Sequence, residues 1–173
     1  ELTVIGHSSN AKQALAELNR LYENAAKQPG NAEMTGNILY QRAMIYSDRL
    51  GQPAKAVADL RRYLELSPGN PNAQNALGYT LLTLPTPQIE EAFTLISAAF
   101  EQLPEEPAVN DSLGWAYFLK GDPEAALPYL QYAFEQYPDA EVASHLGEVL
   151  WKLGKPEDAK AIWNEGLKQE GDI

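Results

Sequence analysis

The chain has 173 residues, 45% of them hydrophobic, no cysteine, and a formal net charge of −11 at pH 7. Without cysteine it has no disulfide, no thiolate metal ligand and no cysteine nucleophile, and no apolar run approaches the roughly 18 residues of a membrane-spanning helix. The acidic balance and the absence of a basic stripe argue against nucleic acid or anionic lipid as ligands.

The first 36 residues predict a partial, irregular repeat. Ser8, Ser9 or Asn10 are candidate N-caps for a helix that extends to about Lys27 with apolar residues at helical spacing. We interpret this helix as the second helix of a truncated repeat. Because the chain opens with Glu1 rather than methionine, we expect a processed or excised piece, in which a signal peptide or lipid anchor of the whole protein would not be seen.

A short motif then recurs along the chain as Gly51-Gln52-Pro53, Gly121-Asp122-Pro123 and Gly154-Lys155-Pro156, each followed three residues later by alanine. A repeat of about 34 residues is typical of a stack of supersecondary units. The pattern predicts a single domain, 1–173, in which the partial repeat is followed by units at 37–70, 71–106, 107–139 and 140–173.

The unit at 107–139 shows the pattern most clearly. It has the pair Leu113-Gly114, then Tyr117, then Ala126 on a second helix, and Pro138 at its end. This resembles the tetratricopeptide repeat, in which small residues let two helices cross closely. The resemblance predicts an all-α, right-handed tetratricopeptide superhelix (α-solenoid) of about four to five helix-turn-helix repeats and roughly nine helices. In the unit at 37–70 the equivalent pair is degraded to Ala43-Met44.

A repeat register also predicts which side chains face the concave groove, the usual binding surface of a solenoid. In the first full unit these are Ile38, Gln41, Ile45, Asp48 and Arg49. In the later units they form an aromatic strip with polar neighbours, which we interpret as a groove for a partner segment: Tyr79, Trp115, Phe118 and Trp151, flanked by Asn75, Asp111, Ser144 and Glu148. The alternative for Trp115 and Phe118 is ordinary packing between repeats.

The charge is uneven along the chain. Residues 88–173 hold 5 Lys and Arg against 17 Asp and Glu, a balance of −12, while all arginines lie in the first half. This acidic half is interpreted either as a solvated surface or as a field that steers a basic partner.

Nothing in the sequence predicts catalysis or a cofactor. Its two histidines, His7 and His145, stand in no metal-binding spacing, and no phosphate-binding glycine loop is present. His145 is expected to have a surface or packed structural role. The chain is therefore expected not to be an enzyme, and to have another protein or peptide as its partner.

The last helix leaves Ile162, Trp163 and Leu167 without a further repeat to cover them. Either Trp163 packs inward, or this end docks on another copy or a missing segment. The second reading gives an alternative function, a structural protein that self-associates through the ends of its solenoid.

Four phrases carry a closer resemblance over residues 37–170: N-A-L-G-Y, D-S-L-G-W, H-L-G-E-V-L-W and K-L-G-K. They resemble the C-terminal repeats of envelope tetratricopeptide lipoproteins of Gram-negative bacteria. Some members of that family are adaptors that activate a periplasmic carboxyl-terminal processing protease and deliver cell-wall hydrolases to it. The resemblance implies a non-catalytic scaffold that faces the periplasm and is attached to the outer membrane, while composition leaves a cytoplasmic location open.

Overall fold

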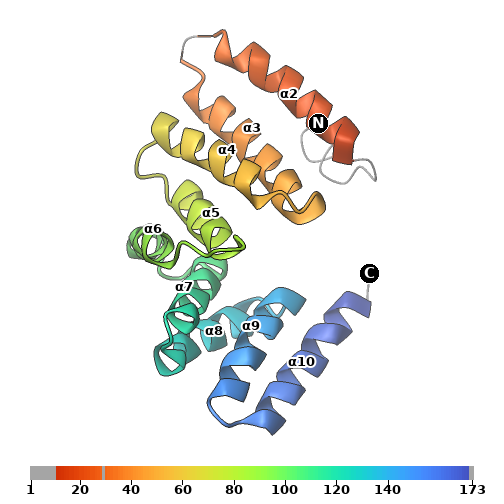
Figure 1. Ribbon diagram of the computed structural model, residues 1–173, viewed down its shortest axis with the longest axis vertical. Coiled ribbons are helices and arrows are strands. Elements are labelled where there is room, and N and C mark those ends of the chain that lie inside the picture. The colour runs from red at the N-terminus through yellow and green to blue at the C-terminus, as the bar shows by residue number, and fades with distance from the viewer. Residues whose placement is uncertain (1–10, 29, 172–173) are drawn as a thin grey trace. The chain divides into compact units, whose positions relative to one another are not determined.

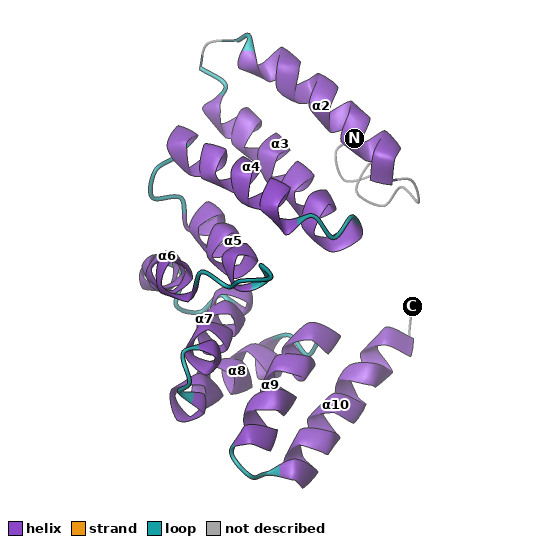
Figure 2. Ribbon diagram, in the orientation of Figure 1, coloured by secondary structure: helices purple, strands orange, loops and turns teal. Residues whose placement is uncertain are grey.

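In a computed structural model of the protein, residues 11–28 and 30–171 are described. Their regular structure is helical, with nine helices and one π-helical segment (Figures 1 and 2): α2 (Ala11–Ala26), α3 (Ala32–Met44), η1 (Ile45–Arg49), α4 (Pro53–Leu66), α5 (Pro71–Leu82), α6 (Ile89–Gln102), α7 (Pro107–Leu119), α8 (Pro123–Gln136), α9 (Ala140–Lys152) and α10 (Pro156–Gly171). The expected all-α class is confirmed. The candidate caps Ser8, Ser9 and Asn10, like His7, lie outside the described residues.

The chain forms two compact units, Glu1–Gln88 and Ile89–Ile173. Helices α2 to α5 and η1 belong to the first unit, and α6 to α10 belong to the second. The boundary falls inside the expected repeat 71–106, between α5 and α6. The expected repeat boundaries and single domain stay predictions.

The recurring motif forms the turns between paired helices. Gly51, Gly121 and Gly154 have φ angles of +59°, +90° and +76°, a left-handed conformation that glycine adopts without strain. The proline that follows occupies the first turn of the next helix, where its missing N–H is not needed. The motif therefore reverses the chain direction between the two helices of a repeat.

The inner-face prediction for the first full repeat is wrong for Ile38 and Ile45, whereas Gln41 is half-buried and Asp48 and Arg49 are exposed. Ile38 and Ile45 are only 2% and 5% exposed, because they pack against Ala14 and Leu18 of α2. The cause is η1, in which Leu50 N donates to the oxygen of Ile45 in a π-turn that holds one more residue than an α-turn.

The additional residue shifts the upstream part of α3 by one place relative to the other repeats. Ala43, which is fully buried, thus takes the position that Gly114 and Gly147 occupy in the later units. Asn37 and Tyr40, each one residue before a predicted inward position (Ile38 and Gln41), are the exposed residues here.

Close helix crossings explain the small residues of the second unit. A Cβ on Gly114 would lie 2.6 Å from Leu130 Cγ, and one on Gly147 would lie 2.5 Å from Trp163 Cδ1. Such separations are far inside normal contact, so only glycine lets α7 approach α8, and α9 approach α10, this closely.

At the other end of the α3/α4 and α9/α10 hairpins, the small residue lies on the first helix in one hairpin and on the second helix in the other. In the first unit Gly36 on α3 faces the Tyr63 ring, whose Cδ2 lies 2.5 Å from where a Cβ would be and whose Cε2 lies nearer still. In the second unit the small partner is on the second helix, where a Cβ on Gly166 would lie 2.5 Å from Ala143 Cβ. Tyr63 and Gly166 each follow the first proline of their helix by ten residues, so they hold the same place in their repeats.

Candidate functional site

The second unit brings six of the predicted groove residues onto two helices. Trp115 and Phe118 of α7 are half-buried, and their rings stack with centroids 5.0 Å apart and planes at 28°. Trp115 also stacks on His145 of α9, with ring centroids 4.2 Å apart and planes at 21°. We call the surface that carries these helices the α7/α9 face: Asp111, Trp115 and Phe118 from α7, and Ser144, Glu148 and Trp151 from α9.

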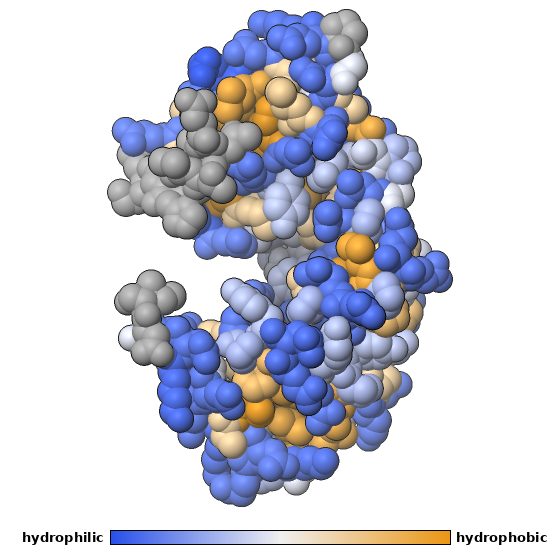
Figure 3. Space-filling view, turned by 180° about the vertical axis from the view of Figure 1, so that it is seen from behind, coloured by the Kyte–Doolittle hydropathy of each residue, from blue (hydrophilic) through white to orange (hydrophobic). Residues whose placement is uncertain are grey.

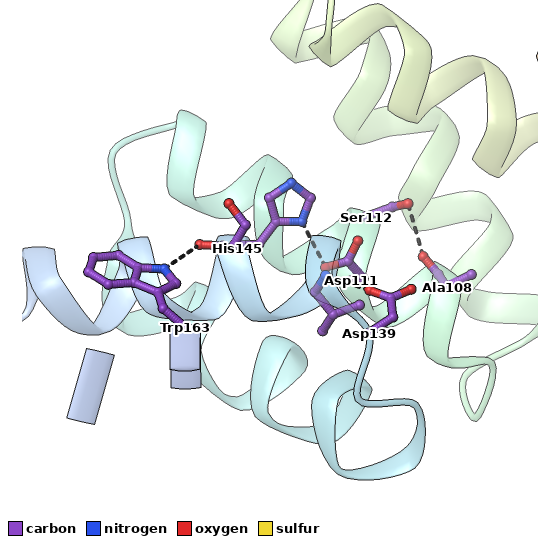
Figure 4. Close-up of polar contacts among 8 residues, drawn as sticks. Ala108, Asp111, Ser112, Asp139, His145 and Trp163 are labelled. Atoms are coloured by element: carbon purple, nitrogen blue, oxygen red, sulfur yellow. Dashed lines mark hydrogen bonds and ion pairs between the residues drawn. The ribbon is translucent and has the colours of Figure 1, made fainter. Parts of the chain in front are cut away.

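A buried polar contact joins α7 to α9. Nδ1 of His145 lies 2.9 Å from Oδ1 of Asp111, and each residue is only 7% exposed (Figure 4). Burial lowers the pKa of His145, but the hydrogen bond to Asp111 and the charges of Asp111, Glu141 and Glu148 raise it, and the net pKa is above its ordinary value. The pair fixes the ring on which Trp115 stacks.

Two local hydrogen bonds place these helices. Asp139 caps α9, because its Oδ1 accepts from the backbone N–H of Val142 at 2.8 Å. Ser112 on α7 is buried and its hydroxyl donates to the Ala108 carbonyl at 3.0 Å, so it offers no hydroxyl to a partner (Figure 4).

One side of α9 remains exposed along its length. The exposed residues on this side are Glu141, Ser144, Glu148 and Trp151. The last three follow Glu141 by three, seven and ten residues, and this spacing places all four on one side of the helix. We call these four residues the α9 stripe. The opposite side is buried in the core of the unit: Val142, Ala143, Leu146, Val149 and Leu150.

Trp151 ends the α9 stripe and is 53% exposed. Its ring stacks on Trp163 of α10 at a centroid distance of 5.9 Å and 29°. Trp163 is in turn half-buried over Gly147, and its Nε1 donates to the Ser144 carbonyl at 3.4 Å. Of the two alternatives stated for Trp163, the structure therefore has inward packing. The exposed indole of Trp151 thus stacks on the indole of Trp163, which is held in place by the core.

The remaining predicted residues lie apart from this arrangement. Ile162 packs partly against the same core, whereas Leu167 is 64% exposed. Asn75 and Tyr79 are both half-buried on α5 of the first unit, and Oδ1 of Asn75 is buried without a hydrogen-bond partner among the described groups. A binding role for the predicted residues of either unit stays a prediction.

Sequence reasoning missed His145 as the buried residue that supports this face through Asp111 and Trp115. The available signal was its distance from Asp111, which is 34 residues, one repeat length. Residues one repeat apart lie on neighbouring units of a stack, so an acid and a histidine at that spacing are candidates for contact.

In the described part of the chain, no group of three or more His, Asp or Glu side chains is arranged to hold a metal ion. Nor is any helix in that part both long and apolar enough to cross a lipid bilayer. On the side drawn in Figure 3, hydrophilic side chains predominate and apolar ones are exposed between them.

Three family models, each described as tetratricopeptide repeat, match residues 36–70, 87–141 and 117–172. Among curated proteins, the chain is 43% identical over 112 residues, 65% of its length, to the TPR repeat-containing protein PA4667 of Pseudomonas aeruginosa. It is 39% identical over 85 residues, 49% of its length, to bacteriophage adsorption protein A of Escherichia coli. The matches span only 19% and 8% of these two proteins.

Solved structures share the fold at low sequence identity. TTC0263, a thermophilic TPR protein of Thermus thermophilus, has a TM-score of 0.73 at 18% identity, with 92% of this chain and 82% of that one covered. MamA from Desulfovibrio magneticus RS-1 has a TM-score of 0.62 at 19% identity, with 91% and 96% covered. At these identities the likeness shows the fold alone.

Proposed function

Because the chain belongs to the tetratricopeptide repeat family, we propose that it is a non-catalytic scaffold that holds a segment of a partner protein on its α7/α9 face. Proteins of this family generally act as scaffolds for protein–protein interaction. The observation that carries the proposal is Trp151, an indole that is 53% exposed although it is stacked on Trp163.

Exposure of a fixed aromatic ring favours binding for two reasons. Tryptophan is enriched among the residues that dominate interface energetics. A ring that is already immobilised loses little conformational entropy when a partner covers it. Ser144 and Glu148, which are exposed on the same side of α9, supply a hydroxyl and a carboxylate to the polar groups of a bound segment.

Our proposal extends to the partner and the location. The four phrases that resemble envelope lipoproteins support an adaptor role in the bacterial periplasm, and the relative that is 43% identical is a bacterial protein. The full-length protein would be attached to the outer membrane, and its partner would be a carboxyl-terminal processing protease or the hydrolases delivered to it.

A capture experiment with the full chain tests this proposal. The wild type, Trp151→Ala and Tyr137→Ala are immobilised separately and exposed to envelope extract, and bound proteins are identified by mass spectrometry. Tyr137 is a matched control, because it is an aromatic residue of the same unit that is 62% exposed but lies outside α7 and α9. We expect the protease or a wall hydrolase on the wild type and Tyr137→Ala, and a loss of most of it on Trp151→Ala. Equal capture by all three would refute the role of this face.

One observation favours the alternative function, self-association through the end of the repeat array. Leu167 and Phe134 each follow the first proline of their helix by eleven residues, yet Phe134 is 8% exposed and Leu167 is 64% exposed. Phe134 is covered by the core to which α9 contributes, and Leu167 has no such cover. If the end docks on a second copy, light scattering at high micromolar concentration gives a dimer mass or more, and Leu167→Glu reduces it to the monomer. A monomer mass for the wild type would exclude this alternative.

A further inference from the structure

We infer that the α9 stripe binds a segment rich in lysine or arginine, with one cationic side chain over the Trp151 indole and others against Glu148 and Glu141. This inference rests on the proposed function and names the chemistry of the partner. It combines two independent features, an exposed aromatic face and a row of carboxylates. Neither alone would define the ligand.

The first feature is the indole itself. Trp163 covers one side of Trp151, and about half of the Trp151 surface remains exposed. The face of a tryptophan ring attracts ammonium and guanidinium groups more strongly than do the rings of tyrosine or phenylalanine. The second unit already contains this type of contact, because Lys120 Nζ lies 4.2 Å from the centroid of the Phe93 ring.

The second feature is the charge on α9. Glu148 lies three residues before Trp151, and Glu141 lies seven residues before Glu148, all on the exposed side. Asp111 is bonded to His145, and Lys152 follows Trp151 at the C-terminal end of α9. The two exposed glutamates both act to raise the pKa of His145, so a cation on this face is stabilised by them.

The charge of the whole unit points the same way. Residues 89–173 hold 5 Lys and Arg against 17 Asp and Glu, because residue 88 is uncharged, and their balance is −12. A field of this sign speeds the approach of a basic segment and repels an acidic one. A partner segment that ends in an acidic tail would need lysines and arginines on the binding face, so it does not fit this unit.

The spacing of the stripe sets the pattern of the segment. Seven residues of α-helix separate Glu141 from Glu148 by about 10 Å along the axis. An extended chain advances about 3.3 Å per residue, so two basic residues three positions apart match the two carboxylates. Trp151 lies a further ~4.5 Å along α9, within reach of a third long side chain or of the first one in another rotamer.

A random peptide library tests the inference and does not require that the partner be identified. Twelve-residue peptides displayed on phage are selected on the full chain, and parallel selections use Glu141→Gln/Glu148→Gln and Trp151→Ala. The control is Glu101→Gln/Glu135→Gln, which removes the same two charges from exposed positions of α6 and α8. Binding of the enriched peptides is then measured by fluorescence anisotropy at low and high salt.

We expect the wild type to enrich peptides with lysine or arginine pairs about three residues apart. Their Kd should weaken about fivefold in Glu141→Gln/Glu148→Gln, change little in the control, and weaken with salt, as for exposed charge pairs. Failure to enrich any peptide, or enrichment without regard to charge, would overturn the inference. Enriched uncharged peptides that still require Trp151 would overturn it while leaving the proposed function intact. Equal weakening of the Kd in the control would also overturn it, because the net charge of the unit rather than the α9 stripe would then attract the peptides.

Discussion

Replacement of Gly147 by alanine tests whether the close crossing of α9 and α10 is a structural requirement. The added Cβ would lie 2.5 Å from Trp163 Cδ1 and closer still to Nε1 and Cε2, whereas ordinary contact begins near 3.4 Å, so the indole must retreat by well over 0.9 Å. That movement lengthens the bond from Trp163 Nε1 to the Ser144 carbonyl, which is already 3.4 Å, and disturbs the stack on Trp151.

Two opposing effects set the magnitude. Overpacking a well-filled core costs about 1–3 kcal/mol. Alanine in a helix interior is more stable than glycine by about 1 kcal/mol. The expected net result is a loss of about 1 kcal/mol in the free energy of unfolding, or about 2–4 °C in Tm for a chain of this size.

The assay is urea unfolding followed by tryptophan fluorescence, which reports on the second unit because Trp115, Trp151 and Trp163 are the chain's three tryptophans. Trp163→Leu in the Gly147→Ala background should recover the loss, with a coupling energy of at least about 1 kcal/mol. Gly171→Ala is the control, since a Cβ there meets nothing within 4 Å. A Gly147→Ala variant that is more stable than the wild type would refute the reasoning.

Three further outcomes follow from the polar contacts. Asp111→Ala should lower the free energy of unfolding of the second unit by about 1.5–3 kcal/mol, because a charge-assisted buried bond is lost; an unchanged urea midpoint would contradict this. Since the folded pKa of His145 is raised above the ordinary 6.5, the stability due to the pair is fully present below about pH 6.5 and is lost as pH rises through the folded pKa. The stability difference between wild type and His145→Gln should therefore shrink from pH 5.5 to pH 8.5, and a difference that grows would show the opposite sign. In the first unit, Arg42→Lys should lose the two bonds of 2.7 and 2.6 Å to the Asp59 carboxylate and lower the circular-dichroism transition, while the tryptophan transition moves less; equal shifts of both transitions would show that the two units unfold together.

The repeat pattern predicts most of the fold because it depends on local chemistry. A glycine followed two residues later by proline dictates a turn and a helix start wherever it occurs, and all three copies form that turn. The small residues at Gly114 and Gly147 likewise indicate close crossings, since their neighbours along the helix are large.

The register of the first repeat could not be obtained in this way. The π-turn at Ile45–Arg49 leaves the distance between turns unchanged, so counting residues from Gly51 gives no sign of it. The shift is seen only in the structure, in the hydrogen bond from Leu50 N to the Ile45 oxygen and in the burial of Ile38 against α2.

The candidate site was predictable in its residues and not in their contacts. Register places Asp111, Trp115 and Trp151 on the first helix of their repeats. It does not show that Asp111 is bonded to a histidine from the following repeat, or that Trp151 is stacked on Trp163. Those contacts depend on side-chain rotamers across helices, which one sequence does not determine.

The exchange of large and small residues between hairpins limits how such repeats recombine. Joining α3 to the second helix of the last repeat would set Gly36 opposite Gly166 and leave a void, while the reciprocal exchange would drive the Tyr63 ring into Ala143. In these two hairpins the first and second helices are therefore matched to each other. Gene duplication and shuffling can lengthen or shorten the array by whole hairpins, but single helices are not interchangeable parts.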